Sequence, residues 1–382
     1  MKITIKFSEL KLPFKTIFKQ ASSTRKIGES IWCEVSRGTT TGWGEGCPRK
    51  YVTNETMKGS IQWLSGQVED ISNCIFSLED LQSWIKENES TIDKHPAAFC
   101  ALELALLDLF AREKNQSVEE MLGLIAPPQV CSYTGILGNS SEKKFVETLH
   151  NYLSLGITDF KIKISGDLNK DLSRVRAIHT AFQQSPKLFS VRLDANNYWK
   201  GKPESAIYYL SQFPASLLGI EEPIHPKNFA GLHHISNTLD MPIIIDESAC
   251  TQKDLKRLDF KNHRFIVNLK VSKMGGILRT LQFIDWLQQQ RVPIIIGAHV
   301  GETSILTRAG MCAARAVGQN LVGQEGGYGL MLLKKDKVQP SLMFGQEGKI
   351  HLDKQCQLVS LNKKIQLPIN NWKQGWGLRA CS

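Results

Sequence analysis

Short apolar segments alternate with helical patterns along the second two thirds of the chain, and this alternation restricts the fold more than any other feature. The stretches between the segments carry apolar residues at helical spacing, as at Leu168, Leu172 and Val175. The eight segments are Val130–Leu137, Asp159–Ile164, Phe189–Leu193, Leu217–Ile220, Pro242–Ile245, Phe265–Leu269, Pro293–Ile296 and Asn320–Val322. Such alternation predicts an α/β fold with a parallel barrel.

Polar residues stand at or near the C-terminal ends of six of these segments, at successive intervals of 31, 27, 25, 24 and 29 residues. A barrel of about 250 residues with eight units repeats every ~30 residues. The six residues are Lys163, Asp194, Glu221, Asp246, Lys270 and His299. Because all strands of a parallel barrel end at one face, we expect these side chains to meet at a single opening.

Three of the six residues are carboxylates on consecutive segments: Asp194, Glu221 and Asp246. Oxygen ligands from adjacent strand ends suit Mg²⁺, which keeps its remaining positions for water and substrate; Mn²⁺ is the alternative ion. Asn196 points the same way as Asp194 and could hold a ligand in place. The competing interpretation is that each acid caps a helix or pairs with a nearby lysine.

Two of these acids have an acidic neighbour, which raises the question of which side chain faces the interior. Successive strand residues point to opposite faces, so only one of Glu221 and Glu222 can do so. We expect Glu221 to be the ligand, with Glu222 behind it. We likewise expect Asp246 to be the ligand and Glu247 to support it.

Lysines flank the carboxylates on both sides. Lys161 and Lys163 share one face of the second segment, and Lys270 ends the sixth. A lysine inside a barrel is unfavourable unless it is paired or functional. Near Mg²⁺ and a second ammonium its pKa should fall, which makes it a base near neutral pH. We expect Lys163 and Lys270 to address opposite faces of a substrate, with Lys161 lowering the pKa of Lys163.

The first 125 residues differ in pattern and predict a separate α+β domain. Residues 3–7 and 30–35 alternate as strands, with a polar, basic loop between them at residues 18–26. Helical periodicity is clearest from Pro96 to Arg112. We therefore expect a capping domain over residues 1–125 and a barrel over residues 126–350. The C-terminal segment, residues 351–382 with Trp372 and Trp376, should pack back on the capping domain.

Composition narrows the functional classes. The net charge is +10, but the basic residues are scattered without interleaved aromatic residues, so we expect an anionic small molecule rather than nucleic acid as the partner. Nine cysteines without a C-x-x-C pair favour reduced thiols over disulfides or zinc. No apolar run approaches ~20 residues, and the N-terminus lacks a signal-peptide core, so we expect a cytoplasmic protein without a membrane segment.

Five short motifs, in order and at barrel spacing, resemble the enolase superfamily, muconate-lactonizing subgroup. The similarity extends over most of the chain, including Gly42-x-Gly44-Glu45 and the helix around residues 98–109. The motifs are Lys161-x-Lys163, Asp194-x-Asn196, Ile220-Glu221-Glu222-Pro223, Asp246-Glu247-Ser248 and Asn268-x-Lys270. The resemblance implies a modified TIM barrel, (β/α)7β, with an α+β capping domain. It also implies Mg²⁺ on the three carboxylates and two acid/base lysines on opposite faces of an enolate.

The seventh segment ends with His299 and Glu302. A histidine there resembles the mandelate-racemase subgroup, whose base is a histidine supported by an aspartate on the preceding strand. The preceding position here is Lys270, so we interpret His299 as substrate-binding and Glu302 as supporting.

The resemblance leaves several reactions open, because epimerases, o-succinylbenzoate synthases and muconate cycloisomerases all begin with the same enolate chemistry. Two lysines suit an epimerase, in which one base takes the proton and the other returns it. Dipeptide epimerases usually carry Asp-x-Asp after the eighth strand to hold the substrate's ammonium; this chain has Gly326-Gly327-Tyr328 there, and Glu325 is a partial substitute. Arg25 and Lys26 suggest a second anionic group on the substrate.

We therefore predict a racemase or epimerase that acts on an amino-acid derivative or dipeptide, as a homo-oligomer. A dehydratase or cycloisomerase is the alternative within the family. A Schiff-base aldolase and a non-catalytic barrel that only binds ligands are the alternatives from other classes.

Overall fold

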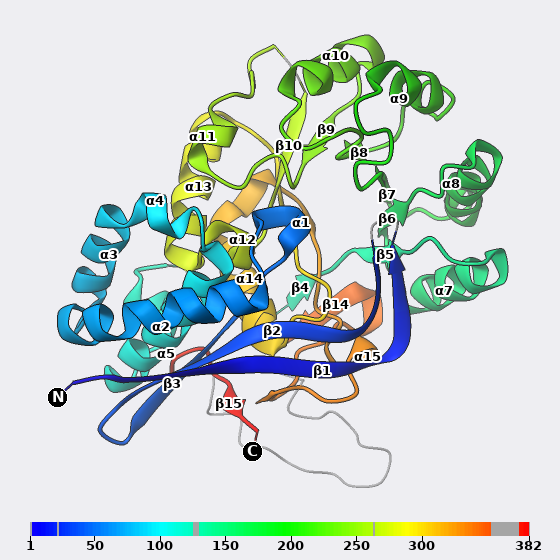
Figure 1. Ribbon diagram of the computed structural model, residues 1–382. Coiled ribbons are helices and arrows are strands. Elements are labelled where there is room, and N and C mark those ends of the chain that lie inside the picture. The colour runs from blue at the N-terminus through cyan, green and yellow to red at the C-terminus, as the bar shows by residue number, and fades with distance from the viewer. Residues whose placement is uncertain (1, 21–22, 125–129, 263, 353–373, 382) are drawn as a thin grey trace, which may run out of the picture.

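The computed structural model describes residues 2–20, 23–124, 130–262, 264–352 and 374–381 (Figure 1). Its main body is an eight-stranded parallel sheet whose strands follow one another in sequence order, β5 to β12. The strands are β5 (Gly135–Leu137), β6 (Asp159–Lys163), β7 (Ser190–Asp194), β8 (Ile220–Glu221), β9 (Ile243–Ile245), β10 (Phe265–Leu269), β11 (Ile294–Ile296) and β12 (Leu321–Gln324). The predicted α/β barrel is thus confirmed.

The two outermost strands of this sheet meet through one backbone hydrogen bond, in which the Thr134 N–H donates to the Gln324 carbonyl at 2.8 Å. The first predicted segment is divided in two. Its beginning forms β4 (Val130–Ser132), which pairs antiparallel with β14 (Lys349–His351) in a separate two-stranded sheet. Only its end, β5, enters the barrel.

Helices cover the outside of the barrel, and several begin with a side chain that accepts a backbone N–H, such as Ser141, Asp167 and Thr303. Between the strands lie α7 (Glu142–Leu155), α8 (Leu168–Phe182), α9 (Pro203–Leu210), α10 (Phe229–Leu239), α11 (Gln252–Leu255), α12 (Val271–Met274), α13 (Ile277–Gln289) and α14 (Ser304–Val317). After β12 come α15 (Gly329–Leu332) and β13 (Val338–Gln339), with short 3-10 turns at Gly318–Asn320 and Gln346–Gly348.

The capping domain consists of a three-stranded antiparallel sheet and a group of helices (Figure 1). The strands are β1 (Thr4–Gln20), β2 (Ser23–Arg37) and β3 (Thr40–Gly46), and the helices are α1 (Lys50–Thr53), α2 (Met57–Cys74), α3 (Leu78–Glu87), α4 (Glu89–Ile92), α5 (Pro96–Glu113) and α6 (Val118–Met121). The predicted boundary at residue 125 lies outside the described residues.

The predicted basic loop at residues 18–26 is wrong as a loop over its described residues, because β1 continues to Gln20 and β2 begins at Ser23. Phe18 pairs with Arg25, and Gln20 pairs with Ser23. Backbone pairing between β1 and β2 extends both strands over positions whose polar, basic sequence predicts a loop. Farther back along the hairpin, Phe14 bridges to Leu333 beside α15.

Helix α5 is buried on every side from Pro96 to Ala111, whereas the sequence predicted one buried face. The glycines of β3 explain how closely the sheet approaches it. A Cβ atom on Gly44 would lie 2.0 Å from the Ala101 carbonyl oxygen, and one on Gly46 would lie 1.8 Å from that of Ala97. Any side chain at these positions would therefore push the sheet off the helix.

Buried acids join the capping domain to the barrel. Glu45, in β3, accepts hydrogen bonds from the backbone and hydroxyl of Thr303, at the start of α14. Glu103, in α5, accepts the first two N–H groups of α13, from Ile277 and Leu278. Both carboxylates meet helix N-termini, where negative charge is favoured.

Of the C-terminal segment, residues 353–373 and therefore Trp372 lie outside the described residues. Trp376 is buried against α5, where its indole N–H donates to the Leu104 carbonyl and its backbone N–H donates to Asp108. The chain then forms β15 (Arg379–Ala380), which pairs with β13. Within the described residues, none of the helices has the length and apolar character needed to span a bilayer.

Candidate active site

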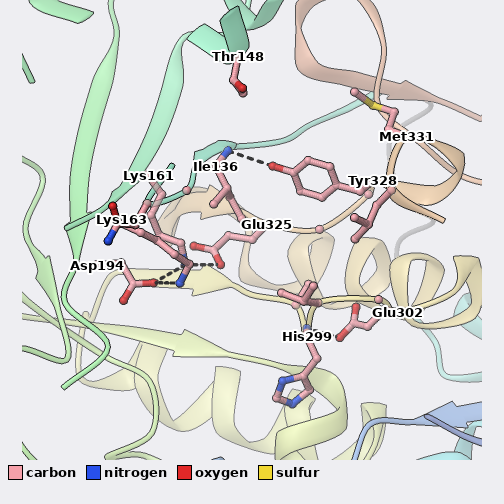
Figure 2. A pocket seen from close by; sticks show the side chains of 18 of the residues that line it. Ile136, Thr148, Lys161, Lys163, Asp194, His299, Glu302, Glu325, Tyr328 and Met331 are labelled. Atoms are coloured by element: carbon pink, nitrogen blue, oxygen red, sulfur yellow. Dashed lines mark hydrogen bonds and ion pairs between the residues drawn. The ribbon is translucent and has the colours of Figure 1, made fainter. Parts of the chain in front are cut away.

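A cavity of about 650 Å³ opens at the C-terminal ends of the barrel strands (Figure 2). It collects nearly all of the residues that the sequence singled out. Its lining includes Lys161, Lys163, Asp194, Asn196, Glu221, Asp246, Glu247, Lys270, His299, Glu302 and Glu325. These side chains come from seven different strands or strand ends and lie far apart in the sequence, so the barrel is what brings them together.

On the β6–β7 side, Lys163 is held by two residues of the next strand end. Its ammonium donates to Asp194 Oδ2 and to Asn196 Oδ1, each at 2.8 Å. The second oxygen of Asp194 accepts the Asn196 N–H at 3.0 Å. Asn196 has a left-handed backbone with φ of 44°, a conformation that asparagine tolerates better than most residues. The turn after β7 therefore fixes both the acid and the lysine.

At the centre, Lys161 bridges three acids. Its Nζ lies 2.8 Å from Glu325 Oε2, 3.2 Å from Glu221 Oε2 and 3.5 Å from Asp194 Oδ2. Asn268, in β10, donates to Glu221 Oε1 at 3.3 Å from the opposite side.

On the β9–β10 side, Asp246 receives two lysines. Lys270 donates to Oδ2, and Lys273 lies 2.9 Å from Oδ1. Lys273 is completely buried and also donates to the backbone carbonyls of Asp246 and Asn268, at 2.6 and 2.8 Å. The carboxylate of Asp246 is thus fixed in position by cations on both oxygens.

Glu222 supports this acid from behind, and it does not line the cavity. Its Oε1 accepts the backbone N–H groups of Asp246 and Ser248, both at 2.7 Å, and its Oε2 accepts the Ser248 hydroxyl at 2.8 Å. Glu221 faces the cavity instead, as the alternation along a strand predicts.

Neighbouring acids raise the pKa values of two of the buried lysines. Burial alone would lower the pKa of Lys270, but the charges of Asp246 and Glu247 raise it well above its ordinary value. Burial likewise opposes the rise in the pKa of Lys161, which Glu221 and Glu325 outweigh. The expected fall in pKa was for a lysine beside Mg²⁺. In this arrangement the lysines themselves are the counterions of the acids, and the pKa values of Lys161 and Lys270 rise. Burial also raises the pKa of Glu221 to about 8.

Three further residues bring unused hydrogen-bonding capacity or a shifted pKa to the cavity. His299 Nε2 and Glu247 Oε2 are buried without a hydrogen-bond partner. Burial and the charge of Lys270 lower the pKa of His299 well below its ordinary range, so the ring is neutral. Glu302 accepts the His299 N–H, and burial raises its pKa to about 8.

Glu325 lines the cavity, as a substrate ligand would, but both of its oxygens are engaged. Oε2 meets Lys161, and Oε1 lies 2.9 Å from Arg192. Arg192 is buried in the barrel and continues to Asp159 at 2.9 Å. Glu325 therefore belongs to a series of ion pairs inside the barrel, from Lys161 through Glu325 and Arg192 to Asp159. The sequence did not predict this series.

Arg25 and Lys26 are not among the residues that line the cavity. Arg25 instead lies over the ring of Tyr51, 5.6 Å from its centre, and Tyr51 does line the cavity. Lys26 is exposed.

Sequence reasoning missed the roles of Lys273 and Arg192 in pairing with the buried acids. The sequence position of each residue could have indicated such a role. Lys273 is the one charged residue in the apolar stretch between Lys270 and the double glycine, and Arg192 precedes Asp194 by two, which places both on the same strand face.

The chemistry of the donor set fits a divalent cation, because three buried carboxylates line one cavity. Each of them already pairs with a lysine: Glu221 with Lys161, Asp194 with Lys163, and Asp246 with Lys270. Among the described residues, however, no three acidic, histidine or cysteine side chains converge closely enough in this conformation to hold an ion together. The lysine ammonium groups lie between the acids. The interpretation in which each acid pairs with a lysine thus describes the contacts, but it does not explain why all three acids line one cavity.

Comparison with known proteins begins with the sequence. A family model described as "Enolase C-terminal domain-like" matches residues 144–355, more than half of the chain. The hydrophobic dipeptide epimerase of Enterococcus faecalis is 27% identical over 319 residues, which cover 82% of this chain and 86% of that one. The L-Ala-D/L-Glu epimerase of Bacillus subtilis is 27% identical over 317 residues, covering 82% and 84%.

Solved structures have the same fold. The substrate-liganded L-Ala-D/L-Glu epimerase from Bacillus subtilis gives a TM-score of 0.80 at 22% identity, over 100% of both chains. The dipeptide epimerase from Enterococcus faecalis V583, complexed with Mg and the dipeptide L-Leu-L-Tyr, gives 0.79 at 22% identity, over 99% of both. From the matched family model, we conclude that this chain belongs to the enolase superfamily, in the mandelate racemase/muconate lactonizing enzyme family.

Proposed function

We propose that this protein is a Mg²⁺-dependent racemase or epimerase acting on an amino-acid derivative or dipeptide. It removes the proton from the carbon beside a carboxylate, forms an enolate and returns a proton to the other face. One observation carries the proposal: Lys163 and Lys270 belong to β6 and to the end of β10, and the acids of the three strands between them line the same cavity.

This arrangement suits a reaction with two bases. A substrate lying above the three acids has one lysine on each side, so one amine can take the α-proton while the other ammonium delivers a proton to the opposite face. Positioned acid/base groups of this kind contribute about 10²- to 10⁴-fold to a rate. Lys161 and Lys273 hold the acids in place without pointing a free amine at the substrate.

Asp194, Glu221 and Asp246 are the residues that would hold the metal ion. When bound, the ion supplies positive charge at the substrate carboxylate and competes with the lysines for the same oxygens. Lys270 must leave its ion pair with Asp246 before it can act as a base, because only the neutral amine accepts a proton. Neutral His299, whose Nε2 is free, would hydrogen-bond the substrate near Lys270.

The relatives support the reaction class, since those compared above are named as epimerases. The substrate is not carried over from them, because the identity is low and the segment after β12 differs from the acidic pair expected of a dipeptide epimerase.

The experiment is α-proton exchange in D₂O with added Mg²⁺ and a library of N-acyl amino acids and dipeptides. We expect deuterium at the α-carbon together with inversion of configuration. Lys163→Ala and Lys270→Ala should each reduce racemisation by about 10²-fold or more, and each should still exchange the enantiomer that faces the remaining lysine. The control is Lys143→Ala, which removes an exposed lysine of α7 and should leave racemisation unchanged.

Two results would count against the proposal. Loss of water from a hydroxy acid, without exchange of amino-acid derivatives, would identify a dehydratase. Mg²⁺ binding by calorimetry with no exchange in the whole library would favour a barrel that only binds its ligand.

A further inference from the structure

The ion pairs inside the barrel contain one more acid than their own cations require. The series from Lys161 through Glu325 and Arg192 to Asp159 alternates two cations with two acids, so its charges balance without a further partner. Glu221 nevertheless also meets Lys161, with its Oε2 3.2 Å from Nζ. The charge of Glu221 is therefore not needed to neutralise Lys161.

The carboxylate of Glu325 is oriented to hold Lys161. Its Oε2 accepts a hydrogen bond from Lys161 Nζ at 2.8 Å, whereas the two oxygens of Glu221 lie 3.2 and 3.4 Å from that nitrogen (Figure 2). Its Oε1 accepts from Arg192 Nη2 at 2.9 Å. Because each oxygen of Glu325 meets a different cation, the side chain cannot turn toward the cavity without breaking one of these pairs.

Arg192 is in turn fixed by the barrel interior. Its side chain is completely buried, and Nη1 donates to both oxygens of Asp159, at 2.9 and 3.0 Å. Its Nη2 also donates to the Thr134 hydroxyl at 2.9 Å. Gly323 leaves room for the guanidinium, since a Cβ there would lie 3.3 Å from both of its terminal nitrogens. Glu325 is therefore anchored on the side away from Lys161.

The three lysines that pair with the acids of the proposed metal site differ in what they can do when a metal ion arrives. Lys163 and Lys270 are the proposed bases, so each can leave its acid as a neutral amine. Lys161 has no such role and stays charged. A buried ammonium that loses its only acid is strongly destabilising. When Glu221 turns to a divalent ion, Glu325 is the acid that can keep Lys161 paired.

We propose that Glu325 is a positioning residue of the metal site: it retains the Lys161 ammonium, so that Glu221 can bind the divalent ion without leaving a buried cation unpaired. In this role Glu325 touches neither the ion nor the substrate, unlike the substrate contact that its sequence position suggested. This inference rests on the Mg²⁺ dependence of the proposed function and assigns a further residue to it.

A double-mutant cycle on Mg²⁺ affinity tests the proposal without depending on catalysis. Titration calorimetry gives the Kd of the parent, Glu325→Gln, Lys161→Met and the double variant. We expect Glu325→Gln to raise the Kd at least about tenfold more in the parent than in the Lys161→Met background, as for residues that share one ion-pair network. A direct effect of the Glu325 charge on the ion acts in both backgrounds and cancels in this comparison.

Two further measurements belong to the same cycle. Lys161→Met by itself should bind Mg²⁺ at least as tightly as the parent, because it removes the cation that competes for Glu221. Glu302→Gln is the matched control, since Glu302 lines the same cavity but accepts the His299 N–H instead of a lysine. Its effect on the Kd should agree within about twofold with and without Lys161.

A crystal structure of the parent with Mg²⁺ supplies a test that needs no variant to fold. Lys161 Nζ should remain within about 3.2 Å of Glu325 Oε2. It should lie more than about 4 Å from both oxygens of Glu221, beyond the range of an ion pair. Coordination of the ion by Glu325, or continued pairing of Lys161 with Glu221, would overturn the inference.

The outcomes also separate this inference from the proposed function. Equal weakening by Glu325→Gln in both backgrounds, or weaker Mg²⁺ binding by Lys161→Met, overturns the inference while the racemase proposal stands. A coupled cycle without α-proton exchange in any compound supports the inference and defeats the proposed function. A parent that does not bind Mg²⁺ overturns both.

Discussion

Removal of the Glu222 carboxylate should weaken both the fold and the proposed metal site, and the size of the effect follows from its contacts. The side chain is completely buried and accepts three hydrogen bonds, two from the backbone of Asp246 and Ser248 and one from the Ser248 hydroxyl. Each hydrogen bond to a charged group contributes about 1.5–3 kcal/mol. Burial raises the pKa of Glu222 to about 7, so the cost of burying its charge offsets part of that sum.

We therefore expect Glu222→Ala to lower the free energy of unfolding by roughly 3–5 kcal/mol. Glu222→Gln keeps an oxygen for the backbone donors and should lose only about 1 kcal/mol. Because Glu222 positions the backbone of Asp246, the alanine variant should also bind Mg²⁺ about 10- to 100-fold more weakly. The exposed acid Glu69, changed to alanine, is the matched control and should change stability by less than about 0.5 kcal/mol.

Urea unfolding followed by circular dichroism measures the first effect, and titration calorimetry with Mg²⁺ measures the second. If Glu222→Ala unfolds within about 1 kcal/mol of the parent and binds Mg²⁺ with the same affinity, Glu222 does not hold Asp246 in place. A stability loss without a change in affinity would restrict its role to the fold.

Three other perturbations follow from the same site. Burial raises the pKa of Glu302 from 4.5 to about 8. Between these two pH values the folded state binds more protons than the unfolded state, so the free energy of unfolding falls as pH rises. Glu302→Gln should make this fall smaller in urea unfolding at pH 5 and pH 9, and an unchanged pH dependence would contradict the raised pKa of Glu302. Lys273→Met removes one of the two buried cations at Asp246 and the donor to two buried carbonyls, and it should cost about 3–5 kcal/mol, read from the urea midpoint. An unchanged midpoint would argue against these contacts. Removal of the divalent metal by a chelator should abolish α-proton exchange. Mg²⁺ at 100 times its Kd should restore the exchange and stabilise the fold by about 2.7 kcal/mol, visible as a higher melting temperature. Exchange that survives chelation would refute metal dependence.

The cavity shows where sequence reasoning reaches its limit. Alternation along β8 was enough to predict that only one of Glu221 and Glu222 faces the interior, because side chains on a strand alternate regardless of their surroundings. The expected one, Glu221, lines the cavity. The role predicted for Glu325 depended on what lies across the barrel. Its partners, Lys161 and Arg192, are 164 and 133 residues away in the sequence, and no local pattern contains that contact.

The hairpin of β1 and β2 gives the same lesson for secondary structure. Residues 18–26 are largely polar and basic, as in a loop, yet residues 18–20 pair with residues 23–25 as neighbouring strands. Conversely, Gly42, Gly44 and Gly46 were visible as a motif, but only the packed structure shows that each removes a clash with α5.

The sequence by itself determined the barrel, its strand order and the positions from which polar side chains enter the opening, since period and spacing are local properties that the backbone converts directly into geometry. Tertiary structure alone decided which lysine pairs with which acid, that Glu325 is engaged on both sides, and that Gly326 and Gly327 leave no room for side chains beside Ala298 and Tyr133. These depend on distances between residues far apart in the chain, and a difference of one or two ångströms separates an ion pair from a free ligand.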